Sequence, residues 1–208
     1  YDITYQTDLN FIKYGLFLKG SRNFFNDRLS FSLGLRTDED TFSEGSNLAD
    51  NISPRLSLSY ALSKDQQWKF NASLGRYFKI PTYTMLGFQK RNVFVNKDAL
   101  YTKSDHYVAG IEYNLTPASR VTVEGFLKKY SNYPISLIDG VSLANKGGGF
   151  EVLGNEAIIS EGLGESRGAE VLFQQKLSNN FYGIFAYTYF FSEFSGIDGI
   201  CLLYTSPS

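Results

Sequence analysis

The segments of this chain that alternate between apolar and polar residues are joined by connections that are short and long in turn. The short connections are Gly20–Arg28, Ser63–Gln67, Thr116–Ser119 and Ser178–Asn180, and the long ones are Thr37–Ser53, Phe78–Ser104 and Tyr133–Glu165. In an antiparallel sheet of sequential strands every second connection lies at the same edge, so the long loops gather on one side. Transmembrane β-barrels show this asymmetry, with short periplasmic turns and long extracellular loops. The rhythm therefore predicts an all-β, antiparallel up-and-down transmembrane barrel segment.

Eight strands follow from the alternation. They are Phe11–Lys19, Leu29–Asp38, Arg55–Leu62, Trp68–Tyr77, Asp105–Leu115, Arg120–Asn132, Ser166–Leu177 and Phe181–Ser192. In the second strand, Leu33 and Leu35 take one face and Ser32 and Gly34 the other, which is the two-residue period of a strand. In the sixth, Lys128 and Lys129 are adjacent, so one must face outward, and their position near the long-loop end lets it leave the hydrocarbon.

The alternation also fits a soluble β-sandwich, whose apolar face turns into a core. The aromatic residues beside the short turns, Trp68, Phe181 and Tyr182, favour the membrane alternative because barrels carry aromatic girdles at both interfaces. No run reaches the roughly 18 apolar residues of a membrane helix. The sequence leaves both alternatives open, together with a complete eight-stranded barrel that acts as an adhesin or structural protein.

Charge and cysteine content exclude several other classes. Lys and Arg number 20 against 21 Asp and Glu, so no basic surface for nucleic acid is expected. A single cysteine, Cys201, rules out a disulfide framework. The one histidine, His106, is expected at the outer rim of the fifth strand, without the partners of a metal or catalytic site. Gly147-Gly148-Gly149 lacks the strand and helix of a phosphate loop.

No arrangement of residues resembles a nucleophile with its base, so we expect no enzyme and no cofactor. The acidic residues Asp38, Glu39, Asp40 and Glu44 offer oxygen ligands for calcium, but their spacing favours a solvated acidic loop. Aromatic and cationic residues of the second and third long loops suit an organic ligand that is anionic or sugar-like. These candidate ligand-binding residues are Tyr83, Phe88, Lys90, Arg91, Phe94, Tyr133, Asn145 and Lys146.

The two ends of the chain predict a fragment. Residues 1–5 show no basic region followed by an apolar run, so no signal peptide is expected there. A long loop is expected from Glu193, but the sequence turns into the apolar run Ile200-Cys201-Leu202-Leu203. We therefore expect residues 1–198 to be part of a barrel and residues 199–208 to be a non-native tail.

Five short motifs resemble the barrel of TonB-dependent outer-membrane receptors. The family often has a "GLR-D" strand end, which Gly34-Leu35-Arg36-Thr37-Asp38 matches, and an "SPR" strand start, which Ser53-Pro54-Arg55 matches. Gly75-Arg76-Tyr77-Phe78-Lys79-Ile80-Pro81-Thr82-Tyr83 is similar to its strand-to-loop passage. Gly110-Ile111-Glu112 and Gly168-Ala169-Glu170 resemble its "G-x-E" strands. The resemblance covers about residues 10–195.

The resemblance implies a nutrient receptor in the outer membrane of a Gram-negative-type bacterium. Such a receptor binds a siderophore, corrinoid or carbohydrate and imports it with energy supplied by TonB through a plug domain. Its partners are outer-membrane lipid, TonB and the small nutrient, and no nucleic acid. The chain departs from the family in lacking the plug, the TonB box and a closing strand, and eight strands fall short of the roughly 22 of a full barrel.

Overall fold

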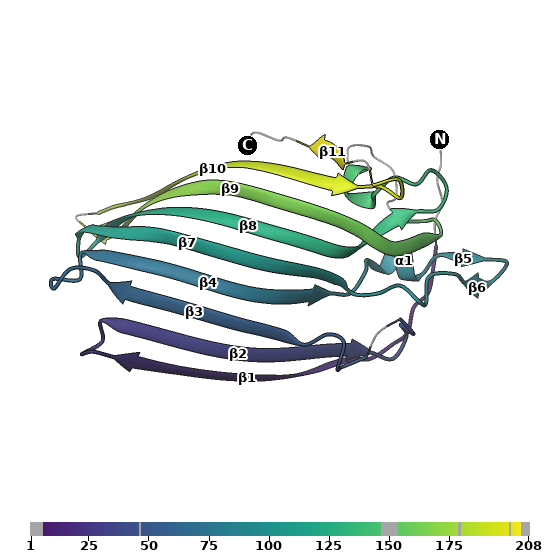
Figure 1. Ribbon diagram of the computed structural model, residues 1–208, viewed down its shortest axis with the longest axis horizontal. Coiled ribbons are helices and arrows are strands. Elements are labelled where there is room, and N and C mark those ends of the chain that lie inside the picture. The colour runs from purple at the N-terminus through teal and green to yellow at the C-terminus, as the bar shows by residue number, and fades with distance from the viewer. Residues whose placement is uncertain (1–5, 46, 147–153, 179, 200, 205–208) are drawn as a thin grey trace.

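The chain forms one long, curved antiparallel sheet. The computed structural model describes residues 6–45, 47–146, 154–178, 180–199 and 201–204, the last four without their side chains. The sheet strands, in spatial and sequence order, are β1 (Lys13–Phe24), β2 (Leu29–Asp40), β3 (Ser53–Ala61), β4 (Trp68–Lys79), β7 (Thr102–Thr116), β8 (Ser119–Ser136), β9 (Ile158–Ser178), β10 (Phe181–Ser195) and β11 (Cys201–Tyr204). Each strand pairs with its sequence neighbour, so the up-and-down topology is confirmed (Figure 1).

The short–long rhythm is confirmed as an arrangement in space. The described parts of the long connections, residues 41–45, 47–52, 80–101, 137–146 and 154–157, all lie at one end of the sheet, and the short turns lie at the other (Figure 1). The long-loop end carries helix α1 (Tyr83–Leu86), the hairpin β5 (Gln89–Lys90) and β6 (Val93–Phe94), and the 3-10 helix η1 (Leu143–Asn145).

The strands run further than the alternation predicted. β2 ends at Asp40, β4 at Lys79 and β8 at Ser136, and β9 begins at Ile158. β1 continues to Phe24, through residues that we expected in a turn. Only the backbone is needed for ladder hydrogen bonds, so pairing continues where the side chains no longer alternate. The expectation of a long loop from Glu193 is also wrong. β10 runs to Ser195, and Glu193 pairs with Leu203 of β11. Whether residues 199–208 are native stays a prediction.

The register places the apolar and polar side chains on opposite faces of the sheet. Leu33, Leu56, Leu74 and Tyr107 stand side by side across β2, β3, β4 and β7. Leu33 is 56% and Leu74 48% exposed, although a soluble sandwich would bury such a row beneath a second sheet. A row of exposed apolar side chains that crosses four strands indicates a lipid-facing surface.

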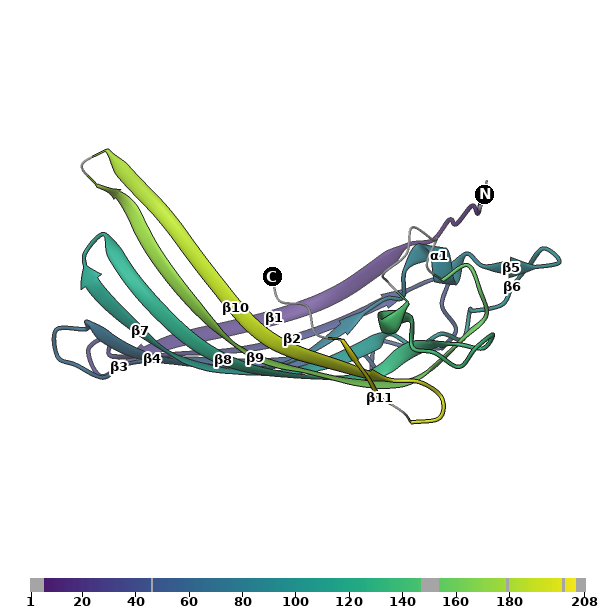
Figure 2. The same ribbon diagram turned by 90° about the horizontal axis from the view of Figure 1, so that it is seen from above.

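The sheet is bent into a trough, and the polar face is its concave side (Figure 2). α1 lies over the concave side at the long-loop end, where its residues meet Tyr77 and His106 of the polar face in one cavity. The convex face is therefore the apolar one. This is the arrangement of a barrel wall with a polar lumen.

Charged side chains mark the outer limit of the apolar convex face. Arg76, Asp105, Lys129 and Glu165 stand in one register row from β4 to β9. Arg76 Nε lies 2.7 Å from Asp105 Oδ1. Lys129 faces outward while Lys128 faces the lumen, as expected from their adjacent positions. The convex surface thus changes from apolar to ionic toward the long-loop end.

The main buried apolar cluster lies at the base of the long loops and not within the sheet. Its buried members are Ile80, Met85, Leu86, Ala99, Tyr101, Leu143 and Ile158. Five come from the connection 80–101, Leu143 comes from η1 and Ile158 begins β9, so the second and third long loops share a core. Because side chains in such a core interlock, the loops are expected to hold a defined shape.

Within the described part of the chain, we find no helix that is long and apolar enough to cross a membrane.

Candidate functional site

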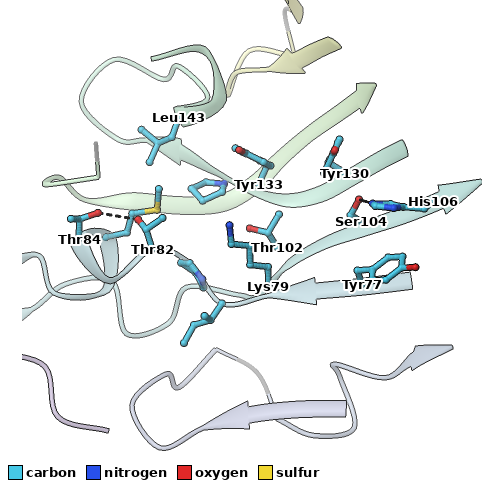
Figure 3. A pocket seen from close by; sticks show the side chains of 14 residues that line it. Tyr77, Lys79, Thr82, Thr84, Thr102, Ser104, His106, Tyr130, Tyr133 and Leu143 are labelled. Carbon is cyan, nitrogen blue, oxygen red and sulfur yellow. Dashed lines mark hydrogen bonds between the residues drawn. The ribbon is translucent and has the colours of Figure 1, made fainter. Parts of the chain in front are cut away.

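A cavity of about 730 Å³ opens on the concave face at its long-loop end (Figure 3). It is lined by Tyr77, Lys79, Ile80, Pro81, Thr82, Thr84, Met85, Thr102, Ser104, His106, Tyr130, Tyr133, Pro134 and Leu143. We call it the outer-end cavity. Its volume lies in the range of small-molecule sites.

Strand alternation places the floor of the outer-end cavity. Tyr77, Ser104 and Tyr130 occupy one register row across β4, β7 and β8. Lys79 and His106 lie two residues from Tyr77 and Ser104 along their strands, so they project from the same face.

The cavity wall is rich in aromatic rings. The ring centroids of Tyr77 and His106 are 4.5 Å apart, and His106 Nε2 lies 2.7 Å from Ser104 Oγ. On the other side, Tyr133 packs edge-on against Tyr130 at 6.2 Å and lies 4.7 Å from Phe194. Such rings bind planar or hydrophobic ligand groups, and their hydroxyls add hydrogen bonds.

Lys79 supplies the positive charge of the outer-end cavity. Among the described residues it forms no ion pair, and its amine points toward Thr102 (Figure 3). Hydroxyls of Thr82 and Thr84 lie at the rim, 3.0 Å from each other. An apolar or aromatic ligand with one anionic group matches this lining.

Asn96 joins the two long loops above the cavity. Its amide nitrogen donates to the carbonyls of Met85 and Glu156 at 2.8 Å each, and its amide oxygen accepts from Ile158 N–H at 3.0 Å. Asn96 is only 1% exposed. Both loops therefore share one buried clamp, which holds Met85 in the cavity wall.

Ionic contacts stabilise the third long loop. Lys146 Nζ lies 2.8 Å from Asp139 and 3.0 Å from Glu156, which also accepts a hydrogen bond from Ser136. The hydrogen bond from Lys146 lowers the pKa of Asp139. Burial lowers the pKa of Lys146, but the hydrogen bonds to both carboxylates outweigh burial and raise it. Both groups therefore stay charged at neutral pH, and the ion pairs hold Asp139 and Glu156 together through Lys146.

The structure brings one of the predicted ligand residues, Tyr133, into the outer-end cavity. Asn145 instead donates to the carbonyl of Phe194 at 3.0 Å, and Lys146 forms the ion pairs above. Tyr83 is on α1, 58% exposed, with its ring against Phe11. A direct ligand role for these residues stays a prediction.

The other predicted residues lie on or beside the β5–β6 hairpin, which projects beyond the sheet end (Figure 1). Phe88 is half-buried, and Lys90 and Arg91 are exposed. Phe94 packs edge-on against Phe42 at 5.0 Å. The hairpin is therefore separate from the cavity lining.

Sequence reasoning missed the strand residues of the outer-end cavity. We predicted Tyr77 and His106 at strand ends and Lys79 in the long connection Phe78–Ser104, and none of the three in a site. Their polar-face positions were available from the alternation, which puts Tyr77 and Lys79 in phase with Ser73 of β4. The contribution of Met85 could not be found in this way, because α1 has no pattern that predicts its fold over the sheet.

The acidic residues considered for calcium are engaged elsewhere. Asp38 accepts two hydrogen bonds from Arg36, and Asp40 accepts one from the Tyr101 hydroxyl at 2.7 Å. Glu44 pairs with Lys97 at 2.8 Å. Burial, followed by the hydrogen bond to Asp40, raises the pKa of Tyr101 far above its ordinary value, so it stays a donor. Across the residues described, no group of three or more His, Cys, Asp or Glu is placed to hold a metal. Gly147-Gly148-Gly149 lies outside them.

Comparison with known proteins gives a family match over almost the whole chain. The family model described as TonB dependent receptor-like, beta-barrel matches residues 1–207. A search of curated protein sequences gives no match.

Solved structures share the fold at low sequence identity. The outer membrane transporter YddB from Escherichia coli superposes with a TM-score of 0.65 at 14% identity, covering 89% of this chain and 25% of that one. The alcaligin outer membrane receptor FauA from Bordetella pertussis gives 0.59 at 15% identity, covering 94% and 32%. The copper transporter OprC gives 0.61 at 18% identity, covering 92% and 30%. The chain thus spans about a quarter to a third of the length of these transporters.

Proposed function

Because the chain belongs to the TonB-dependent receptor-like β-barrel family, whose place is the outer membrane, we propose that it forms part of the wall and of the outer ligand site of a nutrient receptor. The remaining strands, a plug domain and coupling to TonB belong to this proposal. In the complete receptor the outer loops and the lumen wall bind a scarce nutrient. Energy delivered through TonB then releases it inward.

The outer-end cavity is the observation that carries the proposal. Its lining combines residues of the concave face with Thr84 and Met85 of α1 and Leu143 of η1, and in the proposed receptor this position would lie between the outside and the lumen. The exposed apolar convex face fits lipid contact and disfavours a soluble sandwich. The wall does no covalent chemistry in this role, and receptor or transporter is the function of the family.

The cavity lining supports a small organic nutrient with aromatic or apolar groups and a negative charge. The siderophore, corrinoid and carbohydrate classes all contain ligands of suitable size. FauA is described as an alcaligin receptor and OprC as a copper transporter, so structurally similar barrels are described with different cargoes. The cargo is therefore tested with a panel and not with a single compound.

Deleting the receptor gene in its host will abolish uptake of one nutrient class, and inactivating TonB will abolish the same uptake. We propose to measure accumulation of radiolabelled iron supplied with different siderophores, of cyanocobalamin and of maltooligosaccharides. Uptake that is unchanged for every class, or that survives the loss of TonB, would contradict the proposed function.

Replacing Tyr133 with alanine will weaken binding of that nutrient about tenfold, because an aromatic contact of about 1 kcal/mol and its packing are lost. Binding to the purified complete receptor is measured by isothermal titration calorimetry. Tyr182→Ala is the matched control, since Tyr182 is 74% exposed beside a short turn at the opposite end. Equal affinities for the two variants would argue against the outer-end cavity as the ligand site.

A further inference from the structure

Basic side chains form a row across the concave face below the outer-end cavity. Lys19, Arg55, His106 and Lys128 stand in a single register row, separated by Gly34 and Gly75 and continued by Ser166 and Ser192. We call these four residues the cation belt; Lys19, Arg55 and Lys128 carry its charge, and the His106 imidazole is counted as neutral at pH 7. In the paired strands β1–β10, neither this row nor the concave-face row on either side contains a carboxylate.

The belt is only partly neutralised within the described chain, because the Asp38 carboxylate lies near enough to Arg55 to interact with its charge. Lys19, Arg55 and Lys128 form no ion pair with any described residue, whereas Arg36, one row outward, is paired with Asp38 at 2.6 Å. The Arg55 guanidinium lies 4.5 Å from the Tyr77 ring centroid, and its buried Nε–H has no acceptor among the described residues. Unpaired cations gathered on one wall attract an anion.

Below the belt, small uncharged polar side chains cover four neighbouring strands. Ser21, Ser32, Ser57 and Ser73 stand side by side across β1–β4, and Asn23, Ser30, Ser59 and Asn71 form the next row. We call these eight residues the hydroxyl patch. Every member offers both donors and acceptors and carries no charge.

Two hollows lie over these residues. One, of about 300 Å³, is lined by Lys19, Arg36 and Arg55 together with Ser32, Ser57 and Ser73. The other, of about 260 Å³, lies over Ser30, Ser59 and Asn71 and is also lined by the acidic residue Glu124. Lys19 and Arg55 are two strands apart, about 10 Å, so one monosaccharide can reach between them. The first hollow therefore joins cations and hydroxyls at the scale of a sugar. The second shares Ser57 and Ser73 with it and adds amide and carboxylate groups that can bind further sugar hydroxyls.

We propose that the cation belt and the hydroxyl patch bind a phosphorylated sugar in the lumen of the complete receptor. The phosphate contacts the belt, where the planar guanidinium of Arg55 suits its oxygens, and the sugar hydroxyls bond to the serines and asparagines. This inference rests on the proposed function and narrows its cargo to anionic, hydroxyl-rich solutes. An acidic protein segment in the lumen would use the belt but would need no hydroxyl patch.

Calorimetric titration of the purified complete receptor tests the proposal, with glucose 6-phosphate as probe and with glucose and inorganic phosphate for comparison. We expect glucose 6-phosphate to bind tighter than either, and tighter at low than at high salt. Arg55→Gln will weaken its binding about tenfold through loss of a charge-assisted contact. Ser57→Ala will weaken the binding of glucose 6-phosphate but leave the binding of inorganic phosphate unchanged.

Lys64→Gln is the matched control, because Lys64 is exposed in the short turn between β3 and β4 and should leave binding unchanged. The proposal is overturned if glucose 6-phosphate binds no tighter than glucose or phosphate. It is likewise overturned if the Arg55→Gln and Lys64→Gln variants bind glucose 6-phosphate with the same affinity. It is also overturned if Arg55→Gln lowers the melting temperature while glucose 6-phosphate binding is unchanged, which would indicate an acidic protein segment as occupant. If the receptor fails these tests but still takes up another nutrient in a TonB-dependent way, only the phosphorylated-sugar proposal is rejected and the proposed function is retained.

Discussion

Replacing Asn96 with alanine will open the two long loops and weaken nutrient binding about a hundredfold, the largest loss expected from any single loop residue. The substitution removes three buried hydrogen bonds and leaves the Glu156 carbonyl and the Ile158 N–H without their partner, while the Met85 carbonyl keeps the hydrogen bond from the Phe88 N–H. Buried polar groups left unsatisfied cost about 1–3 kcal/mol each, so a local loss of about 4 kcal/mol is expected. The wall of the outer-end cavity at Met85 would lose its anchor.

Limited proteolysis of the complete receptor in detergent measures the opening, and calorimetric titration of the nutrient measures the affinity. We expect trypsin to cut near Lys90 and Lys97 many times faster in Asn96→Ala, with the strands still protected. Asn92→Gly is the control, because Asn92 is exposed at the hairpin tip with φ of 61°, a conformation that glycine adopts freely. Equal cleavage rates in the two variants would show that Asn96 does not hold the loops.

Replacing Val123 with arginine will prevent the barrel from assembling in the membrane. Val123 lies on the convex face, 49% exposed, with Ile111 and Val171 directly opposite on the neighbouring strands. An arginine near the middle of the lipid face costs about 2–4 kcal/mol. Assembly is measured as the amount of heat-modifiable receptor in the outer-membrane fraction, which should fall in the Val123→Arg variant.

Val108→Arg is the matched control for Val123→Arg, since Val108 lies on the concave face opposite Ser73 and Phe126. A charge there faces the polar lumen, so assembly should be close to wild type. If both arginine variants assembled equally well, the assignment of the convex face to lipid would be refuted.

The sheet was predictable because its signal is local. In a strand, successive side chains alternate between faces, so Leu33 and Leu35 against Ser32 and Gly34 define two surfaces without any knowledge of the partner strand. Short turns then fix sequential pairing, which gives the up-and-down order and the end where the long loops gather. The bounds were less predictable: β2 and β8 extend past the alternation, because backbone pairing does not depend on side-chain polarity.

The candidate site was only partly predictable because loop composition does not report contacts. Tyr133 was expected to bind ligand and does line the outer-end cavity, while Asn145 and Lys146 were expected to do the same and are engaged within the protein. An amide or an amine suits a ligand and a loop clamp equally well. Only the fold of residues 80–101 and 137–157 onto one another separates these roles.

The sequence by itself determined the strand class, the two faces of the wall and the family, since each depends on residue types two positions apart or on short motifs. Only the tertiary structure shows which side chains become neighbours on the concave face and in the long loops. Asn96 bonds to Glu156, 60 residues away, and the cation belt joins four strands that span residues 13 to 136. Such neighbours are set by register and loop packing, which sum many weak long-range contacts that no local pattern contains.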